Sequence, residues 1–312
     1  MSLIDSHGRR IRKLRLSLTD KCNLRCHYCM PLDQTFMDEK TYLSKEEIYE
    51  IIAELVELGL EEIRLTGGEP LLRKSFPEIL QTLSSLKLKK LALTTNGILL
   101  DRHFDEFLQY GVHHLNISLD SLRPETFRKI SHGDHFHRVM RNILKAKELG
   151  FVVKLNAVMM KGINDQEILD FVEFSARTGM EVRFLELMRI GYACEEQADQ
   201  FISAQEMMGL IQKKYSLKPV TFAGDSTSFN YLAGTEAQIG FIASESKAFC
   251  GACSRWRLSA DGVLRACLLK EDGLSIKGVS PETRIELYYQ LLGMKPLMRP
   301  TEVGHAMNLI GG

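Results

Sequence analysis

Short apolar segments alternate with longer amphipathic segments over the first two thirds of the chain. Residues 48–56 show the helical form of this pattern, because isoleucine, leucine and valine recur there at helical spacing. Ser44 lies just before this stretch and Glu47 follows three residues later, which is the residue pair of a capping box. The pattern therefore predicts a helix that begins after Ser44 and ends at Gly59.

The same alternation continues along the chain and predicts six strand–helix units. We expect strands over residues 14–18, 62–65, 91–95, 115–119, 152–159 and 182–188, and further helices over 76–85, 101–110, 138–149 and 165–178. Such alternation is typical of an α/β fold with a parallel sheet and helices outside it. Six units favour a partial or complete barrel over a doubly wound sheet.

The rhythm changes after about residue 216, where short strands are expected near 227–232 and 238–242. We therefore expect two parts, a barrel over residues 1–216 and a smaller C-terminal α+β domain over 217–312. Cys22, Gly68, Thr94, Ser118 and Met188 follow or end predicted strands. Ligand sites of parallel α/β folds collect at that edge of the sheet, so these residues are candidates for a binding site.

Charge changes this picture only locally, since the chain has 40 basic and 40 acidic residues. A neutral balance gives no general attraction to nucleic acid or to an anionic membrane. The first 18 residues hold no apolar run suited to a signal peptide or a membrane span, so we expect a cytoplasmic protein. The basic cluster from Arg9 to Arg15 fits either a solvated strand edge or an anion-binding role.

Six of the seven cysteines form two tight groups, which indicates reduced thiols for metal binding or catalysis rather than a disulfide framework. Cys22, Cys26 and Cys29 have the spacing C-x3-C-x2-C. Three thiolates can hold an iron–sulfur cluster and leave one iron open to a ligand that is not protein. A zinc knuckle with His27 as the fourth ligand is the alternative.

This loop and the Gly67-Gly68-Glu69-Pro70 turn together resemble the radical S-adenosylmethionine superfamily. The resemblance implies a partial (βα)6 barrel and a [4Fe-4S] cluster whose open iron binds S-adenosylmethionine. One electron then cleaves the sulfonium and gives a 5′-deoxyadenosyl radical. In our interpretation the glycine pair lets the backbone approach the ligand, Glu69 faces the ammonium group, and Tyr28 covers the adenine side.

Cys250, Cys253 and Cys267 form a second triad with the spacing C-x2-C-x13-C and with no evident fourth ligand nearby. This again suggests a cluster with an open iron. Arg255 and Arg257 lie between these cysteines and would attract an anionic or phosphorylated ligand, unless they form ordinary surface ion pairs.

The two triads, the Arg255-Trp256-Arg257 run and the terminal Gly311-Gly312 resemble the molybdenum cofactor biosynthesis protein A family, whose members are GTP 3′,8-cyclases. The resemblance implies that the second [4Fe-4S] cluster binds the guanine of GTP and that the product passes to cyclic pyranopterin monophosphate synthase. It also implies a homodimer and an electron donor such as flavodoxin or ferredoxin. The implied GTP contacts are Arg15, Arg64, Thr94, Lys154, Arg255 and Arg257. The implied S-adenosylmethionine contacts are Tyr28, Gly68, Ser118 and Met188.

Two departures from the family pattern concern the loop after Met188 and the tail. Cys194 in this loop is expected to be a free thiol. A ligand role at the second cluster would close the iron meant for the substrate and would undermine the cyclase interpretation. A basic residue often precedes the Gly-Gly ending, and here the nearest candidate is His305.

Two other functions compete with GTP cyclisation. One is a diverged radical enzyme acting on a peptide or another small molecule, and the other is a non-catalytic zinc or nucleic-acid-binding protein.

Overall fold

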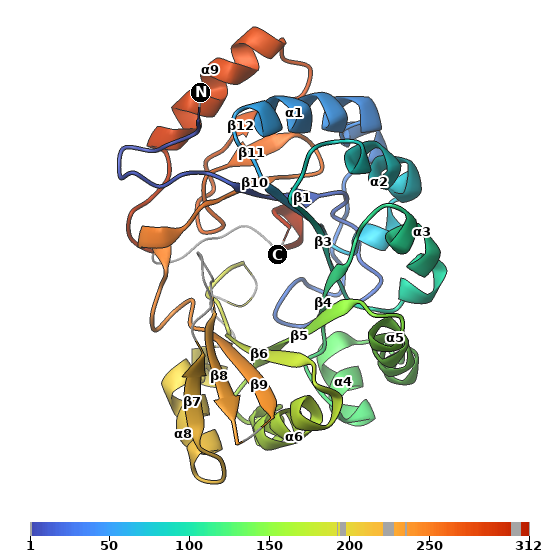
Figure 1. The fold of residues 1–312 in the computed structure, drawn as a ribbon, viewed down its shortest axis with the longest axis vertical. Coiled ribbons are helices and arrows are strands. Elements are labelled where there is room, and N and C mark those ends of the chain that lie inside the picture. The colour runs from blue at the N-terminus through green and yellow to red at the C-terminus, as the bar shows by residue number, and fades with distance from the viewer. Residues whose placement is uncertain are drawn as a thin grey trace.

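The computed structural model describes residues 2–191, 193, 198–220, 228–234, 236–300 and 307–311. Within these residues the strands form one twelve-stranded sheet that curves around a central space, with helices outside it (Figure 1). Cys194, His305 and Gly312 lie outside the described residues. Among the described helices, none has the length and apolar character needed to cross a membrane.

Six consecutive strands lie side by side and parallel in chain order, as the sequence pattern predicts. They are β1 (Lys13–Ser17), β2 (Glu62–Thr66), β3 (Lys90–Thr95), β4 (His114–Ser118), β5 (Val152–Met159) and β6 (Glu181–Glu186). Helices follow them on the outside: α1 (Lys45–Glu57), α2 (Phe76–Ser84), α3 (Phe104–Gln109), α4 (Pro124–Ser131), α5 (Phe136–Glu148), α6 (Ile168–Thr178) and α8 (Ala204–Gln212). The α/β fold and the partial barrel are therefore confirmed.

Most predicted helices are present, and the differences have local causes. Helix α1 begins with the complete capping box of Ser44 and Glu47. The helix predicted over 101–110 is instead a 3-10 turn, η3 (Leu100–Arg102), followed by α3, because His103 between them has φ −131° and ψ 5°. Helix α4 was not predicted, although Pro124 occupies the first helical turn, where proline is well tolerated.

Strands from the C-terminal third extend both ends of this sheet. β10 (Arg255–Leu258) pairs in parallel with β1, and β9 (Ala237–Ile242) pairs in parallel with β6. Antiparallel strands complete the two edges: β11 (Val263–Arg265) and β12 (Leu274–Ser275) beside β10, and β8 (Phe229–Ala233) and β7 (Leu217–Val220) beside β9. The strands expected near 227–232 and 238–242 correspond to β8 and β9, and Thr227 lies outside the described residues. Helix α9 (Pro281–Gly293) follows β12.

Alternation along β5 shows how the sequence produces a polar interior. Val153, Leu155 and Ala157 are buried in the hydrophobic core. Lys154 and Asn156 take the positions between them and line the central cavity. Successive side chains of a strand point to opposite faces, so one face packs against helices and the other carries chemistry.

Candidate active site

The curved sheet surrounds a cavity of about 720 Å³. A cavity of this size lies within the range of small-molecule sites. Of the residues predicted to bind a cluster, S-adenosylmethionine or GTP, all except Glu69 line its wall. These are Arg15, Cys22, Cys26, Tyr28, Cys29, Arg64, Gly68, Thr94, Ser118, Lys154, Met188, Cys250, Cys253, Arg255, Arg257 and Cys267.

The glycine pair positions the first cysteine loop by contacting its backbone. Gly68 N donates to Thr19 O at 2.7 Å, and Glu69 N donates to Lys21 O at 2.7 Å. A Cβ atom on Gly68 would lie 2.3 Å from Lys21 O, and one on Gly67 would lie 2.4 Å from Thr19 O. The close approach expected at these glycines is thus made by the protein's own chain, just before Cys22.

Glu69 also differs from the expectation that its carboxylate faces an ammonium group. The side chain is fully buried. It accepts hydrogen bonds from Thr95 Oγ1 at 2.8 Å, from Asn96 N at 2.7 Å and from Leu71 N at 3.2 Å. Glu69 therefore joins the ends of β2 and β3, and burial raises its pKa to about 7.

The thiols of the first triad lie on the cavity wall in surroundings that disfavour the free thiolate. Burial, followed by the nearby Glu69 carboxylate, raises the pKa of Cys22 to about 11. Burial and the Cys22 and Asp120 charges raise the pKa of Cys29 to about 12, and burial also raises that of Cys26. Three half-buried thiols without a strong cationic partner suit a metal group that brings its own positive charge.

The second triad has a different electrostatic environment. Burial by itself raises the pKa of the Cys253 thiol, but Arg255 and Lys295 outweigh it and lower the value to about 6. Lys295 Nζ donates to Cys253 Sγ at 3.4 Å, and Leu269 N donates to Cys267 Sγ at 3.4 Å. All six cysteines of the two triads are free of disulfides.

The triads also bear on the zinc alternative, in which one ion would bind a whole group of side chains. Within the described part of the chain, no group of three or more His, Cys, Asp or Glu side chains is placed to hold one metal ion. In a cluster each thiolate binds a different iron, so the cysteines need not converge on one ion. His27 instead lies 3.4 Å from Gln200, measured from Nε2 to Oε1.

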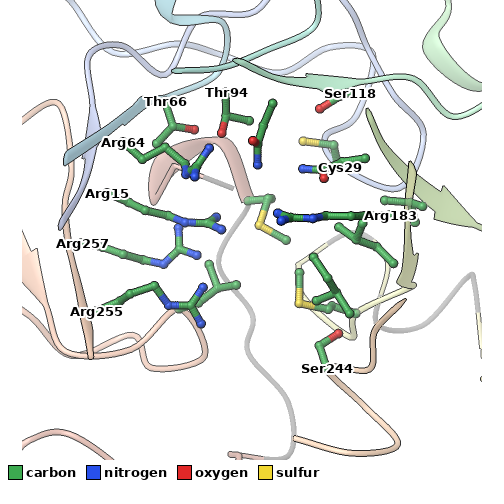
Figure 2. Close-up of a pocket in the computed structure, with 18 of the residues that line it drawn as sticks. Arg15, Cys29, Arg64, Thr66, Thr94, Ser118, Arg183, Ser244, Arg255 and Arg257 are labelled. Carbon is green, nitrogen blue, oxygen red and sulfur yellow. The ribbon is translucent and has the colours of Figure 1, made fainter. Parts of the chain in front are cut away.

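Four arginines form one wall of the cavity. Arg15 on β1 lies in register with Arg64 on β2 and with Arg257 on β10, so three guanidinium groups occupy neighbouring strands. Figure 2 shows them one above another with Arg255, while Arg183 points toward them from the opposite wall. Among the described residues none of the four has an ion-pair partner.

This wall carries positive charge that the protein does not neutralise. Burial and the charges of Arg257, Arg255 and Arg64 lower the pKa of Arg15 well below its usual value. Burial lowers the pKa of Arg64 to about 10 and, together with Arg255, that of Arg257 to about 9. Arg64 Nη1 is buried without a hydrogen-bond partner. The wall is therefore suited to an anion with several oxygens.

The facing wall adds polar groups around a buried carboxylate. Glu181 forms ion pairs with Lys154 at 2.6 Å and with Arg183 at 2.5 Å. Asn156 is in register with Arg183, lines the same cavity and has a buried Oδ1 without a partner. Lys154 therefore lines the cavity with its charge shared with Glu181.

The remaining predicted residues lie around the first triad and the tail. Tyr28 donates its hydroxyl hydrogen bond to Asp120 Oδ2 at 2.8 Å, so the aromatic ring is fixed in the cavity wall. Met188 packs beside Cys267 against Ile190 and Leu269. Arg257 Nη1 donates to Gly311 O, which ties the tail to β10.

Sequence analysis missed several residues of this site. Asn156 and Arg183 share inward-facing positions with Lys154 and could have been found by continuing the alternation along β5 and β6. Asp120 follows β4 two residues after Ser118, on the same face. Lys295 had no comparable pattern, because it is an isolated residue after helix α9.

Comparisons with known proteins agree with this geometry. The family described as "Radical SAM superfamily" matches residues 16–175, and "Molybdenum Cofactor Synthesis C" matches residues 180–288. A GTP 3′,8-cyclase of Synechocystis sp. is 58% identical over 311 residues, covering 100% of this chain and 95% of that protein. A GTP 3′,8-cyclase of Aquifex aeolicus is 39% identical over 279 residues, covering 88% of this chain and 87% of that protein.

Among solved structures, Streptococcus suis SuiB bound to the precursor peptide SuiA has a TM-score of 0.65. Its identity is 13%, and the match covers 91% of this chain and 66% of that one. At this identity the likeness concerns the fold, which is the same partial barrel. The sequence relatives carry the family assignment: the chain belongs to the radical SAM superfamily and, within it, to the family of GTP 3′,8-cyclases.

Proposed function

We propose that this chain is a GTP 3′,8-cyclase. It uses S-adenosylmethionine and a reductant to convert GTP into (8S)-3′,8-cyclo-7,8-dihydroguanosine 5′-triphosphate, the first step of molybdenum cofactor biosynthesis. The observation that carries the proposal is the wall formed by Arg15, Arg64, Arg255 and Arg257, which lies in one cavity with both cysteine triads. A triphosphate would supply the negative charge that balances these guanidinium groups, since none of them has an ion-pair partner among the described residues.

The first triad and the strand ends around it form the S-adenosylmethionine side of the site. Cys22, Cys26 and Cys29 would hold a [4Fe-4S] cluster, which supplies the electron that cleaves the sulfonium of S-adenosylmethionine. Tyr28, Gly68, Ser118 and Met188 lie on the cavity wall and are the contacts that we assign to this cofactor.

The second triad and the arginine wall form the substrate side. Cys250, Cys253 and Cys267 would hold the second [4Fe-4S] cluster close to the guanine. Arg15, Arg64, Arg255 and Arg257 would bind the triphosphate oxygens, because guanidinium groups form paired hydrogen bonds with phosphate. Thr94 and Lys154, which line the cavity, are assigned to the same substrate.

The proposal has consequences for organisation and partners. We assign residues 1–216 to the barrel and 217–312 to a unit that completes it. A flavodoxin or ferredoxin would supply electrons, and cyclic pyranopterin monophosphate synthase would take the product. Reduced thiols require a reducing compartment, which supports a cytoplasmic location. We further propose that the chain forms a homodimer and that it binds neither nucleic acid nor a membrane.

The direct test is anaerobic reconstitution followed by turnover. Wild-type chain should contain about eight irons and eight sulfides. With S-adenosylmethionine, GTP and reductant it should yield 5′-deoxyadenosine and the cyclised nucleotide, detected by mass spectrometry. If 5′-deoxyadenosine forms while GTP stays intact, the cyclase assignment fails and a diverged radical enzyme is the better description. Zinc without sulfide would exclude both.

A binding test addresses the substrate wall. Arg255 stacks over the Phe249 ring at 5.2 Å and lines the cavity. Arg255→Ala should weaken GTP binding while leaving the spectrum of the first cluster unchanged. Arg123, whose exposed side chain pairs with Asp170 at 2.8 Å, supplies a matched control in Arg123→Ala. Equal GTP affinity in the Arg255 and Arg123 variants would contradict the assigned role.

A further inference from the structure

Lys295 is a buried lysine directly behind the second cysteine triad. It follows helix α9, and the residue is 5% exposed. Its Nζ donates to Cys253 Sγ at 3.4 Å, to Arg255 O at 2.8 Å and to Ala266 O at 3.0 Å. An ammonium group has three donors, and here each of them has an acceptor.

These three bonds connect the separate segments that carry the cysteines. Cys253 is contacted directly, Arg255 begins β10, and Ala266 immediately precedes Cys267. The backbone of Lys295 is held in turn by Arg9, whose Nη2 donates to Lys295 O at 2.9 Å. Arg9 Nη1 also donates to Cys250 O at 2.8 Å, so the network reaches the third cysteine.

Arg9 is itself fixed by the N-terminal segment. It is buried and forms an ion pair with Asp5 at 2.6 Å. The basic cluster of the N-terminus is therefore divided by function. Arg15 lines the cavity, Arg9 supports the second triad, and Arg10 lies 3.9 Å from Glu61. Arg12 also lies 3.9 Å from Glu61 and lines the cavity.

Lys295 is absent from the cavity wall, which distinguishes it from the substrate-binding arginines. A charge behind the triad acts on the thiolate and leaves the side facing the substrate open. We infer that Lys295 is the positioning residue of the second cluster. It ties the cysteine segments together and places a protein cation against the Cys253 thiolate.

The charge has a measurable consequence. One-electron reduction of a cluster by an added reductant increases the negative charge beside Cys253. An ammonium group in contact with that sulfur stabilises the reduced form and so raises the reduction potential. Loss of the charge should lower the potential of the second cluster and speed its loss of iron to a chelator. The first cluster should be unaffected, because its thiols make no contact with this network.

The test compares Lys295→Gln and Lys295→Arg in the reconstituted full-length chain. Titanium(III) citrate titration followed by electron paramagnetic resonance gives the potential of each cluster. A full-length chain with serine at Cys22, Cys26 and Cys29 assigns the second signal. Lys277→Gln is the matched control, since Lys277 Nζ donates to the backbone carbonyls of Thr41 and Tyr42 at 2.8 and 2.9 Å.

We expect a lower second-cluster potential and faster iron loss in Lys295→Gln, with the potential near the wild-type value in Lys295→Arg and in the Lys277 control. Wild-type behaviour of Lys295→Gln would overturn the inference, as would equal shifts in the Gln and Arg variants. Parallel loss of both clusters would also overturn it, because the role would then belong to the whole fold. The inference rests on the proposed second cluster; absence of that cluster from wild-type chain would instead refute the proposed function.

Discussion

Replacing Arg64 by methionine should weaken substrate binding and stabilise the empty protein at the same time. Burial, with the nearby Arg183 and Arg255, lowers the pKa of Arg64 from 12.5 to about 10. That shift corresponds to a strain on the charged form of up to roughly 3 kcal/mol. Since Nη1 has no hydrogen-bond partner, the substitution breaks no bond at this atom. The free energy of unfolding of the apo chain should therefore rise.

The same substitution removes a charged donor from the triphosphate. A hydrogen bond to a charged group contributes about 1.5–3 kcal/mol, so the Kd for GTP should rise by roughly 10- to 150-fold. Anaerobic calorimetry gives the Kd, and urea unfolding of the apo chain gives the stability. Arg123→Met, which removes an exposed arginine, should leave Kd unchanged. An unchanged Kd for Arg64→Met, or affinity and stability falling together, would refute the reasoning.

Three further predictions concern the loop, the buried carboxylate and the tail. Gly68→Ala places a Cβ 2.3 Å from Lys21 O and should displace the loop that carries the first triad. The iron content after reconstitution should therefore fall from about eight to about four per chain. Retention of the first cluster's spectrum would contradict this prediction. The pKa of Glu69 is raised from 4.5 to about 7 by burial, so the native state binds this proton more tightly and stability falls as pH rises through that interval. Glu69→Gln in the apo chain should remove up to about 3 kcal/mol of that fall, and an unaltered pH slope in urea unfolding would refute it. Gly311→Ala adds a side chain at φ +69° with its Cβ 2.9 Å from Thr66 Cγ2 and should displace the tail. Turnover should then fall roughly tenfold while both clusters are retained. Turnover equal to that of the wild type would exclude a role for the tail.

The local pattern of apolar and polar residues was sufficient to predict the barrel and to place many candidate site residues at the ends of its strands. The ends of parallel strands meet at one edge, so residues such as Thr94 and Ser118 could be placed together without knowledge of the fold. The alternation along β5 could also have predicted Asn156 as a site residue, because Lys154 and Asn156 point to the same face of the strand. These features depend on the period of a strand, which is visible in the sequence.

The second triad could be placed beside the first only through the family resemblance. Its proximity depends on the pairing of β10 with β1, in which Arg257 lies opposite Arg15 across more than two hundred residues of sequence. The periodicity of a segment does not show which distant segment it will pair with, so this pairing could not be predicted from local sequence. Lys295 is the extreme case, since one lysine after a helix is ordinary in a sequence and becomes informative only through the sulfur and carbonyl oxygens around it.

The two ends of the cavity differ in charge, and this difference orients the ligands. Beside the first triad, burial together with Glu69 or Asp120 raises the pKa of Cys22 and Cys26. Beside the second triad, Arg255 and Lys295 lower the pKa of Cys253 in spite of burial. A sulfonium cation is compatible with the first environment, whereas a triphosphate would be repelled there and attracted to the arginine wall. The charge of the walls alone therefore favours one of the two possible arrangements of S-adenosylmethionine and GTP, before any specific contact is formed.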